Sequence, residues 1–276
     1  MSNHEIENEP IFIFAASWRT GSTLLQRVLN ASENVFVYGE PGFISNARML
    51  FERNEDYLQK VSWNRENNKT DKQGQWIPIF NPPVENLYKA FQCYFTSLYN
   101  LSSIGIKENK KWGFKEVRDN AYEDSKFLKK IFPKAKFLFL IRNPFDMYIS
   151  LKGQDAIFNN FKDDKPLYPV EVWNRNVSFF LDHTKINEVG GLVVKYEDLV
   201  DNKTSQETLD NIVEYLDIEY NEKMLSELSM KAGQTTIKNP LTKDEVEKIF
   251  EIIKENNKEL NYTISNDKVK KSKWFS

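Results

Sequence analysis

The sequence predicts an α/β protein with a mainly parallel central sheet flanked by helices. Short, fully apolar runs such as "IFIFAA" at 11–16 and "KFLFLI" at 136–141 are typical of strands buried on both faces of a parallel sheet. Segments with apolar residues at helical spacing alternate with these runs along the chain. Ligands of such folds bind at the carboxyl ends of the strands, so the loops after the strands are where we expect the chemistry.

The remaining elements follow from the same patterns. The expected strands are the five apolar segments at 11–16, 35–38, 111–116, 136–141 and 191–196. The expected helices show helical spacing or a start signal, and they occupy 22–29, 85–101, 123–132, 144–151, 170–187, 205–218 and 241–257. Thr242 and Glu245 form a capping box at the start of the last helix. Residues 55–84 are rich in Asn, Lys and Asp and contain Pro82-Pro83, so we expect a long loop or insertion there.

Composition and charge limit the class of protein. The 276 residues are 40% apolar and 28% charged, which is ordinary for a globular chain, and we expect one domain over 1–276. A polar tail at 1–9 and a basic tail at 265–276 flank it. The net charge of −2 argues against a nucleic-acid or membrane partner. The one cysteine, Cys93, is expected in the core. Because there is neither a disulfide framework nor a secretory signal pattern, the expected location is cytoplasmic.

The segment "SWRTGSTLL" follows the first strand and has the frame of a phosphate-binding loop. An ordinary P-loop reads G-x-x-x-x-G-K-[ST], whereas here Ala16 replaces the first glycine and Ser22 replaces the lysine. Arg19 supplies a cation two residues before Gly21, and the backbone amides from Thr20 to Leu24 can bind an anion at the helix start. The loop therefore favours phosphate without Mg·ATP. By itself, a purely structural strand-to-helix turn fits it equally well.

A second motif resolves this ambiguity. In a P-loop NTPase one buried strand ends in an aspartate that helps to hold magnesium. Here the strand at 136–141 ends in Arg142, followed by "NPFDMYIS". The planar guanidinium of Arg142 can bind a phosphate directly, and Ser150 can add a hydroxyl donor. The alternative is that Arg142 caps the sheet edge and Ser150 fills a small gap. Two anion sites and no metal ion are the favoured interpretation.

With both motifs, the chain resembles the sulfotransferases that use 3′-phosphoadenosine 5′-phosphosulfate (PAPS). The loop "SWRTGSTLL" is similar to the 5′-phosphosulfate loop in the arginine form of the tyrosylprotein sulfotransferases. "RNPFDMYIS" matches the 3′-phosphate signature R-N-P-x-D-x-x-x-S, and "VVKYEDLV" is similar to the segment that brings a tyrosine near the adenine. The resemblance extends over about residues 11–240. It implies a P-loop NTPase-like sulfotransferase fold, with PAPS as co-substrate, adenosine 3′,5′-bisphosphate as product, and no metal.

The resemblance also implies the site residues. Those expected to contact the nucleotide are Arg19, Thr20, Gly21, Ser22, Thr23, Leu24, Arg142, Ser150, Tyr196 and Lys238; Lys231, Arg118 and Asn120 are weaker candidates. Arg19 and Lys115 are expected to stabilise charge on the leaving phosphate. Glu40, between Gly39 and the turn that ends at Gly42, is similar in placement to the glutamate base of the tyrosylprotein branch. The alternatives are a surface lysine at 115 and a solvated turn carboxylate at 40.

The acceptor and the reaction class complete the prediction. Neither His4 nor His183 is near a predicted strand end, so a histidine base is not expected. The segments 43–111 and 153–170 carry many aromatic residues, and we expect the acceptor pocket there, with 55–111 as an insertion. The expected acceptor is a hydroxyl or amine of a small molecule, such as a natural product or toxin. The rival classes are a P-loop kinase of a small metabolite and a non-catalytic nucleotide-binding protein.

Overall fold

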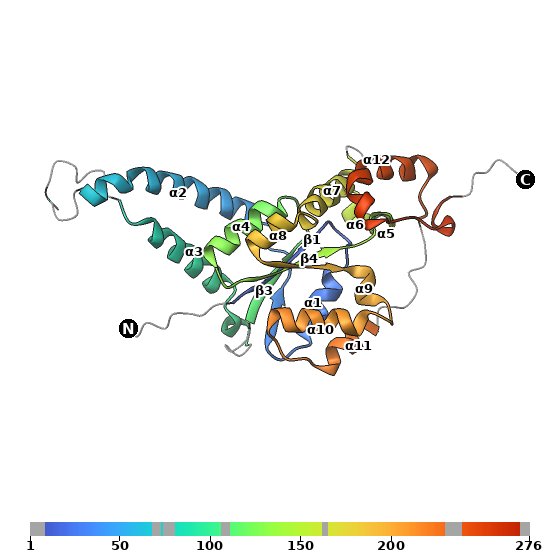
Figure 1. Ribbon diagram of the computed structural model, residues 1–276, viewed down its shortest axis with the longest axis horizontal. Coiled ribbons are helices and arrows are strands. Elements are labelled where there is room, and N and C mark those ends of the chain that lie inside the picture. Colours follow the sequence, from blue (N-terminus) through green and yellow to red (C-terminus); the bar gives the residue numbers. More distant parts are fainter. Residues whose placement is uncertain are drawn as a thin grey trace, which may run out of the picture.

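A five-stranded parallel sheet forms the centre of the molecule (Figure 1). The computed structural model describes residues 9–67, 73, 81–105, 111–161, 165–229 and 239–270. The strand order is β2-β3-β1-β4-β5. The strands are β1 (Ile11–Ala15), β2 (Val35–Tyr38), β3 (Lys111–Glu116), β4 (Lys136–Ile141) and β5 (Gly191–Lys195). All five lie where the apolar runs predict them, and the fold class is confirmed.

Helices cover both faces of this sheet (Figure 1). The longer ones are α1 (Ser22–Asn30), α2 (Ile44–Asn67), α3 (Val84–Leu98), α4 (Ala121–Ile131), α5 (Pro144–Lys152), α7 (Tyr168–Phe180), α10 (Ser205–Leu216) and α12 (Lys243–Leu260). The shorter ones are η2 (Leu101–Ile104), α6 (Asp155–Phe158), α8 (His183–Val189), α9 (Tyr196–Val200), α11 (Glu222–Ser229) and η3 (Asn266–Lys268). The capping box at Thr242 and Glu245 is present, with both of its hydrogen bonds. No helix among the described residues is long and apolar enough to cross a membrane.

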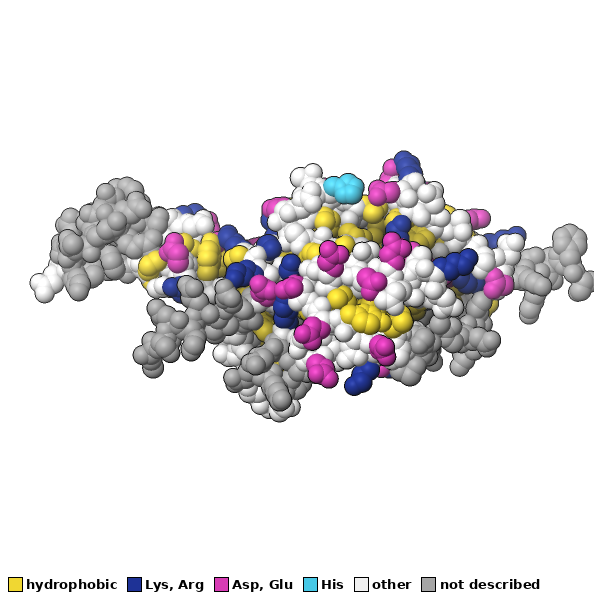
Figure 2. Space-filling model, turned by 60° about the horizontal axis from the view of Figure 1, so that its bottom comes forward, with side chains coloured by type: hydrophobic (Ala, Val, Ile, Leu, Met, Phe, Trp, Pro, Cys, Tyr) yellow, Lys and Arg dark blue, Asp and Glu magenta, His cyan; other side chains and the backbone are white. Residues whose placement is uncertain are grey.

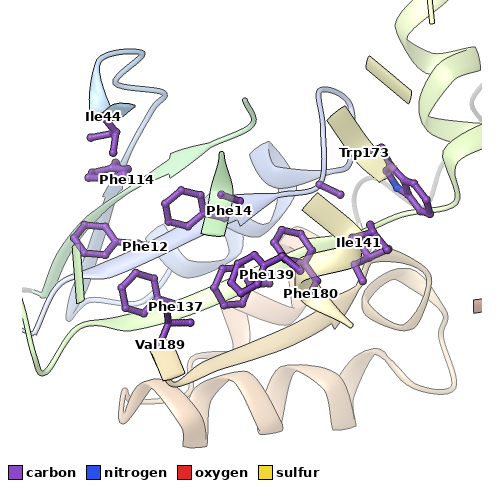
Figure 3. Close-up of a cluster of buried hydrophobic side chains, with 14 of the residues drawn as sticks. Phe12, Phe14, Ile44, Phe114, Phe137, Phe139, Ile141, Trp173, Phe180 and Val189 are labelled. Carbon is purple, nitrogen blue, oxygen red and sulfur yellow. The ribbon is translucent and has the colours of Figure 1, made fainter. Parts of the chain in front are cut away.

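The two faces of the sheet bury different side chains. Successive residues of a strand point to opposite faces, so Phe12 and Phe14 of β1 lie on one face and Ile11 and Ile13 on the other. The phenylalanine face also takes aromatic rings from β3 and β4, as Figure 3 shows for Phe137. The opposite face is aliphatic and packs against α1, α10 and α11. Because phenylalanine and aliphatic residues alternate along β1, each face of the sheet presents a different kind of side chain to the helices that cover it.

The carboxyl ends of the central strands meet at one edge. In the register of β1 with β3, Ile13 lies beside Lys115 and Phe14 beside Glu116. On the other side of β1, Ala15 lies beside Leu140 of β4. The loops that follow β1, β3 and β4 therefore leave the sheet side by side. This is the edge at which the sequence predicts the site.

The segment expected to be a loop at 55–84 is helical in its first part. Helix α2 continues to Asn67 and projects from the sheet with α3 (Figure 1). Polar composition suggested a loop, but ion pairs one turn apart support a polar helix, as between Lys60 and Asp56 at 2.6 Å. Phe51 is buried against the aromatic rings of α3 and α4. Trp76 lies outside the described residues.

Three smaller expectations also differ from the structure. The helix expected at 170–187 is broken into α7 and α8, because the Asp182 carboxylate accepts the backbone N–H groups of Thr184 and Lys185 and starts a new helix. A basic tail was expected at 265–276. Within it, Val269 forms a β-bridge with Leu241, so the first part of this segment packs as part of the folded domain. Residues 271–276 lie outside the described part. Cys93 is exposed rather than in the core.

Candidate functional site

The loop between β1 and α1 makes a tight turn. Arg19 has a left-handed backbone with φ of 62°, and Gly21 has φ of 100°. The buried hydroxyl of Thr20 donates to the carbonyl of Ser17 at 2.6 Å and accepts the Ser17 N–H at 3.2 Å. Thr20 thus braces the turn from inside. The Leu24 N–H donates to the Gly21 carbonyl at 2.9 Å. The amides without helical partners are therefore those before Leu24.

The second motif begins where β4 ends. Asn143 caps α5 by accepting the N–H of Phe145, and Pro144 occupies the first helical position. This cap directs Arg142 back toward the β1–α1 loop, where its guanidinium donates to the carbonyl of Arg19 at 2.9 Å. The Arg19 side chain in turn donates through Nε to the Ser150 hydroxyl at 3.2 Å. The two predicted motifs are thus in direct contact, and Arg19 lies against the second one.

Tyr196 covers both motifs from α9. Its ring centroid is 4.4 Å from the Arg142 guanidinium carbon, a cation–π contact. The same ring lies on Gly21, because a Cβ at position 21 would be 2.3 Å from Tyr196 Cδ2. A side chain at position 21 has no room, which together with the positive φ accounts for glycine there.

Glu40 and Lys115 form an ion pair beside these motifs. Lys115 Nζ is 2.6 Å from Glu40 Oε1, and the side chains are 8% and 31% exposed, respectively. A second cation, Arg118, has NH2 at 3.9 Å from Glu40 Oε2. Lys115 is thus a buried strand-end lysine and not a surface one. Glu40 keeps one face open to solvent, so a substrate can reach its carboxylate.

One cavity of about 290 Å³ joins the two motifs and Glu40. Its lining residues are Trp18, Arg19, Gly21, Ser22, Thr23, Leu24, Glu40, Val117, Arg142, Ser150, Ile157 and Tyr196. Of the other predicted residues, Thr20 lies buried beneath the turn and Lys115 reaches the cavity through Glu40. Lys231 and Lys238 lie outside the described residues. His183 is exposed at the start of α8.

The charges around this cavity suit an anionic ligand. Burial, and then the neighbouring Arg142 charge, lower the pKa of Arg19 below its ordinary value. Within the described part of the chain, neither Arg19 nor Arg142 forms an ion pair with a carboxylate. Nε of Arg142 is buried and has no hydrogen-bond partner. Leaving a buried donor unpaired is costly, so an anion between these cations would relieve both the repulsion and the missing bond.

Sequence reasoning missed the residues that hold the cavity loops in place. Asn176 of α7 donates to the carbonyls of Ala16 at 3.0 Å and Arg118 at 3.1 Å, which ties the loops after β1 and β3 together. Trp173 donates through its indole N–H to the Arg142 carbonyl at 2.9 Å. Trp18 of the wall was also missed. Nothing local in the sequence distinguishes a buried Asn or Trp of this kind from any other helical residue.

On the face shown in Figure 2, acidic and basic side chains are interspersed rather than gathered in one patch. The described residues contain no group of three or more His, Cys, Asp or Glu placed to hold a metal ion. At the carboxyl edge of the sheet, Arg19 and Arg142 bring two cations together in the lining of the cavity.

The fold and the site define an α/β protein with a cavity at the carboxyl edge of its parallel sheet, lined by the loop after β1 and by Arg142. A sequence profile described as the sulfotransferase family matches residues 10–222, and the chain belongs to this family. No curated protein sequence is a significant match.

Solved sulfotransferase structures have the same fold. The sulfotransferase domain of the curacin biosynthetic pathway has a TM-score of 0.53 at 17% identity, covering 94% of this chain and 99% of that one. The domain from the Synechococcus PCC 7002 olefin synthase has a TM-score of 0.50 at 18% identity, covering 96% and 99%. A sulfotransferase from Alicyclobacillus acidocaldarius has a TM-score of 0.52 at 11% identity, covering 93% and 97%. The predicted P-loop-like sulfotransferase fold is confirmed.

Proposed function

We propose that this sulfotransferase moves a sulfuryl group from PAPS to a hydroxyl or amine of a small-molecule acceptor, with Glu40 as general base. The observation that carries the proposal is the convergence of Arg19 and Arg142 in the cavity that Glu40 also lines. Among the described residues, neither arginine has a carboxylate partner. PAPS would supply two anionic groups and the transferable sulfuryl group. Two anion-binding motifs around one cavity fit such a donor.

Arg142, Arg19 and Ser150 are the groups proposed to hold the 3′-phosphate. Arg142 and Ser150 both line the cavity, and Nε of Arg142 has no hydrogen-bond partner among the described residues. Guanidinium groups bind phosphate through charge-assisted hydrogen bonds, which are stronger than neutral ones. A bound phosphate would also offset the repulsion between Arg19 and Arg142. The Tyr196 ring, already stacked on Arg142, is placed to border the nucleoside.

The start of α1 is proposed to hold the 5′ end of the donor. The amides of Ser22 and Thr23 belong to the first turn, where N–H groups have no helical acceptor and the helix dipole favours negative charge. Donors fixed in this way stabilise charge that develops on the leaving phosphate without first having to reorient. Lys115 adds a buried cation beside the cavity, where it is paired with Glu40.

Glu40 is proposed to accept the acceptor's proton at Oε2. Oε1 is held by Lys115 at 2.6 Å, which fixes the direction of the carboxylate. Oε2 lies 3.9 Å from Arg118 and is left for the acceptor. As Glu40 takes up the proton and loses its charge, the Lys115 ammonium is released from this ion pair and can stabilise charge on the leaving phosphate. No histidine is needed for this step.

Aromatic surfaces support an acceptor with an apolar part. Trp18 of the cavity wall packs on Phe161 and Tyr168, with ring centroids 5.1 and 6.4 Å away. A separate apolar cavity of about 420 Å³ lies between α2 and α3, bordered by Phe43, Leu50 and Tyr94 among others. Both surfaces fall in the segments where the sequence predicts the acceptor site. Tailoring of a natural product or toxin is the use we propose.

A thermal-shift titration with adenosine 3′,5′-bisphosphate, with AMP and Mg·ATP as controls, tests the donor site. A ligand that binds only the folded state stabilises it by about 2.7 kcal/mol at 100 times its dissociation constant. We expect a large shift with the bisphosphate that EDTA does not change. A magnesium-dependent shift with ATP and none with the bisphosphate would instead favour a kinase.

Substitution of the base tests the chemistry. Glu40→Gln keeps the shape of the side chain but cannot accept a proton, so we expect it to lose most of its turnover of PAPS while binding the bisphosphate almost as the unchanged protein does. Turnover at the unchanged rate in this variant would remove Glu40 from the mechanism. Bisphosphate binding without turnover of PAPS on any acceptor tried would favour a non-catalytic nucleotide-binding protein.

A further inference from the structure

An apolar cavity of about 420 Å³ lies between α2 and α3, the two helices that project from the sheet (Figure 1). Apolar side chains form most of its wall, and within the described part of the chain no residue of the lining is charged. The lining residues are Phe43, Asn46, Ala47, Leu50, Ala90, Phe91 and Tyr94. Such a wall favours an uncharged, apolar group, because burying a charge without a partner costs much free energy.

This cavity exposes large apolar side chains to solvent. Two of its lining residues, Leu50 and Tyr94, are 58% and 48% exposed. Neighbouring apolar side chains that stay exposed in a folded protein mark a binding surface. Trp18, in the wall of the cavity that Glu40 lines, differs because its ring already packs on Phe161 and Tyr168. Of the two aromatic surfaces, the cavity between α2 and α3 is therefore the better site for an apolar ligand.

The α2–α3 cavity begins close to Glu40 along the chain. Phe43, which lines the cavity, follows Glu40 by three residues, so their Cα atoms are at most about 11 Å apart. The start of α2 is fixed, because the Ser45 hydroxyl and the Arg48 guanidinium donate to the buried Asp124 carboxylate of α4 at 2.7 and 2.8 Å. One end of a small molecule can therefore lie at Glu40 while its other end lies in the cavity.

The volumes of the two cavities favour a division between donor and acceptor. The cavity that Glu40 lines measures about 290 Å³, at the lower end of the range of about 300–1,000 Å³ that is usual for ligand sites. The proposed nucleotide donor would fill this space, so the body of the acceptor needs room elsewhere. A cavity of about 150 Å³ can hold a benzene ring, so the 420 Å³ between α2 and α3 can hold roughly ten or more carbon atoms.

We propose that the α2–α3 cavity binds the body of the acceptor and that the acceptor is an amphiphile. Its hydroxyl or amine would lie at Glu40, and its uncharged alkyl or aryl body, of roughly ten carbon atoms, would fill the cavity. This inference rests on the proposed function and adds the class of substrate to it. Leu50, Phe91 and Tyr94 are then residues that determine specificity, through the apolar surface that they offer to the acceptor.

The test is a calorimetric titration of the protein with straight-chain alcohols from butan-1-ol to octan-1-ol. Each methylene group removed from water raises the affinity about fourfold, so four of them give about 200-fold when they are fully buried. Because the cavity is partly open to solvent, we expect an increase of at least about tenfold. The charged analogue 8-hydroxyoctanoate should bind at least about tenfold more weakly than octan-1-ol. Saturating adenosine 3′,5′-bisphosphate should leave the affinity for octan-1-ol in place, since the two ligands occupy different cavities.

Ala90→Trp fills the cavity from an exposed position on α3. We expect it to lower the affinity for octan-1-ol by at least about tenfold, and to lower kcat/KM for the sulfation of octan-1-ol by a similar factor. Cys93→Trp is the matched control, because it adds the same ring at an exposed position of α3 that does not line the cavity. If Ala90→Trp does not fold, Leu50→Asp places a charge in the wall at an exposed residue and should have the same effect.

Several results would overturn the inference. An affinity that does not rise with chain length would show that no alkyl body is bound. Equal affinities of Ala90→Trp and Cys93→Trp for octan-1-ol, or its displacement by the bisphosphate, would place the alcohol outside this cavity. An unchanged kcat/KM for a sulfated alcohol in Ala90→Trp would remove the cavity from acceptor binding. Failure of the proposed function appears separately, as normal turnover by Glu40→Gln or no thermal shift with the bisphosphate, because the titrations with alcohols alone depend on neither.

Discussion

Gly21→Ala adds a single methyl group at the point where the two motifs proposed to bind anions meet Tyr196. The new Cβ would lie 2.3 Å from Cδ2 and 2.5 Å from Cε2 of the Tyr196 ring. Ordinary contacts between carbon atoms are about 3.5–4.0 Å, so the ring must move by more than an ångström. The backbone cannot avoid this change, because Gly21 has φ of 100° and starts α1.

Two separate costs add to the effect. A side chain at a left-handed position costs about 1–2 kcal/mol. Overpacking against a fixed neighbour costs about 1–3 kcal/mol. We therefore expect the free energy of unfolding to fall by about 2–5 kcal/mol, and the melting temperature by about 4 °C or more. If the ring moves off Arg142, the loss of a cation–π contact of about 0.5–2 kcal/mol would weaken bisphosphate binding by roughly 2- to 30-fold.

The assay is thermal unfolding with and without adenosine 3′,5′-bisphosphate. Gly39→Ala is the matched control, because a Cβ at position 39 meets nothing within 4 Å and the residue lacks a positive φ. The double variant Gly21→Ala/Tyr196→Ala removes the clashing ring, so its loss of stability should be smaller than the sum of the two single losses. Equal melting temperatures and affinities for Gly21→Ala and Gly39→Ala would refute the reasoning.

Three further predictions concern other parts of the site and fold. Arg142→Ala should weaken bisphosphate binding by roughly 10- to 100-fold in a calorimetric titration, the loss expected for charged hydrogen bonds, and AMP binding far less; equal losses would make Arg142 structural. Asn176→Ala should lower the free energy of unfolding in urea by about 2 kcal/mol or more, because the carbonyl of Ala16 loses a buried partner; an unchanged midpoint would contradict this. Asp182→Ala should lower the melting temperature at pH 7. Since the Lys185 N–H lowers the pKa of Asp182 in the folded state, this difference should shrink as the pH falls below about 4, and a constant difference would argue against the cap.

The strands and the two motifs could be predicted because local physics determines them. A strand buried on both faces must be apolar throughout, so the runs that become β1 and β4 are visible in the sequence without any tertiary information. Arg142 and Gly21 could likewise be predicted as site residues, because each lies in the segment that follows a predicted strand. Parallel strands bring their carboxyl ends to one edge, and this alone places both motifs and Glu40 around one cavity.

What the sequence did not predict depends on contacts between distant segments. Asn176 lies 160 residues from Ala16, and only the fold shows that its amide joins two cavity loops. The sequence predicted a loop from residue 55 because the composition there is polar. In the structure these residues continue helix α2, whose buried side includes Phe51. The role of Arg19 at the 5′ end of the donor stays a prediction, and the contact of its side chain with Ser150 of the second motif is visible only in the structure. Whether the Arg19 side chain lies at the 5′ end of the donor or beside Ser150 depends on tertiary contacts, because an arginine side chain is long enough to reach either position.

The segment beyond the matched family region also contributes to the site. The profile ends at residue 222, yet Tyr262 donates through its hydroxyl to Glu197 at 3.0 Å, and Glu197 accepts the Asn143 N–H at 2.8 Å. Lys268 pairs with Asp146 of the same motif at 2.7 Å. These bonds help to fix the turn after β4. Tyr262 and Lys268, which lie beyond residue 222, therefore help to fix the turn that follows Arg142, the residue that we propose to bind the donor.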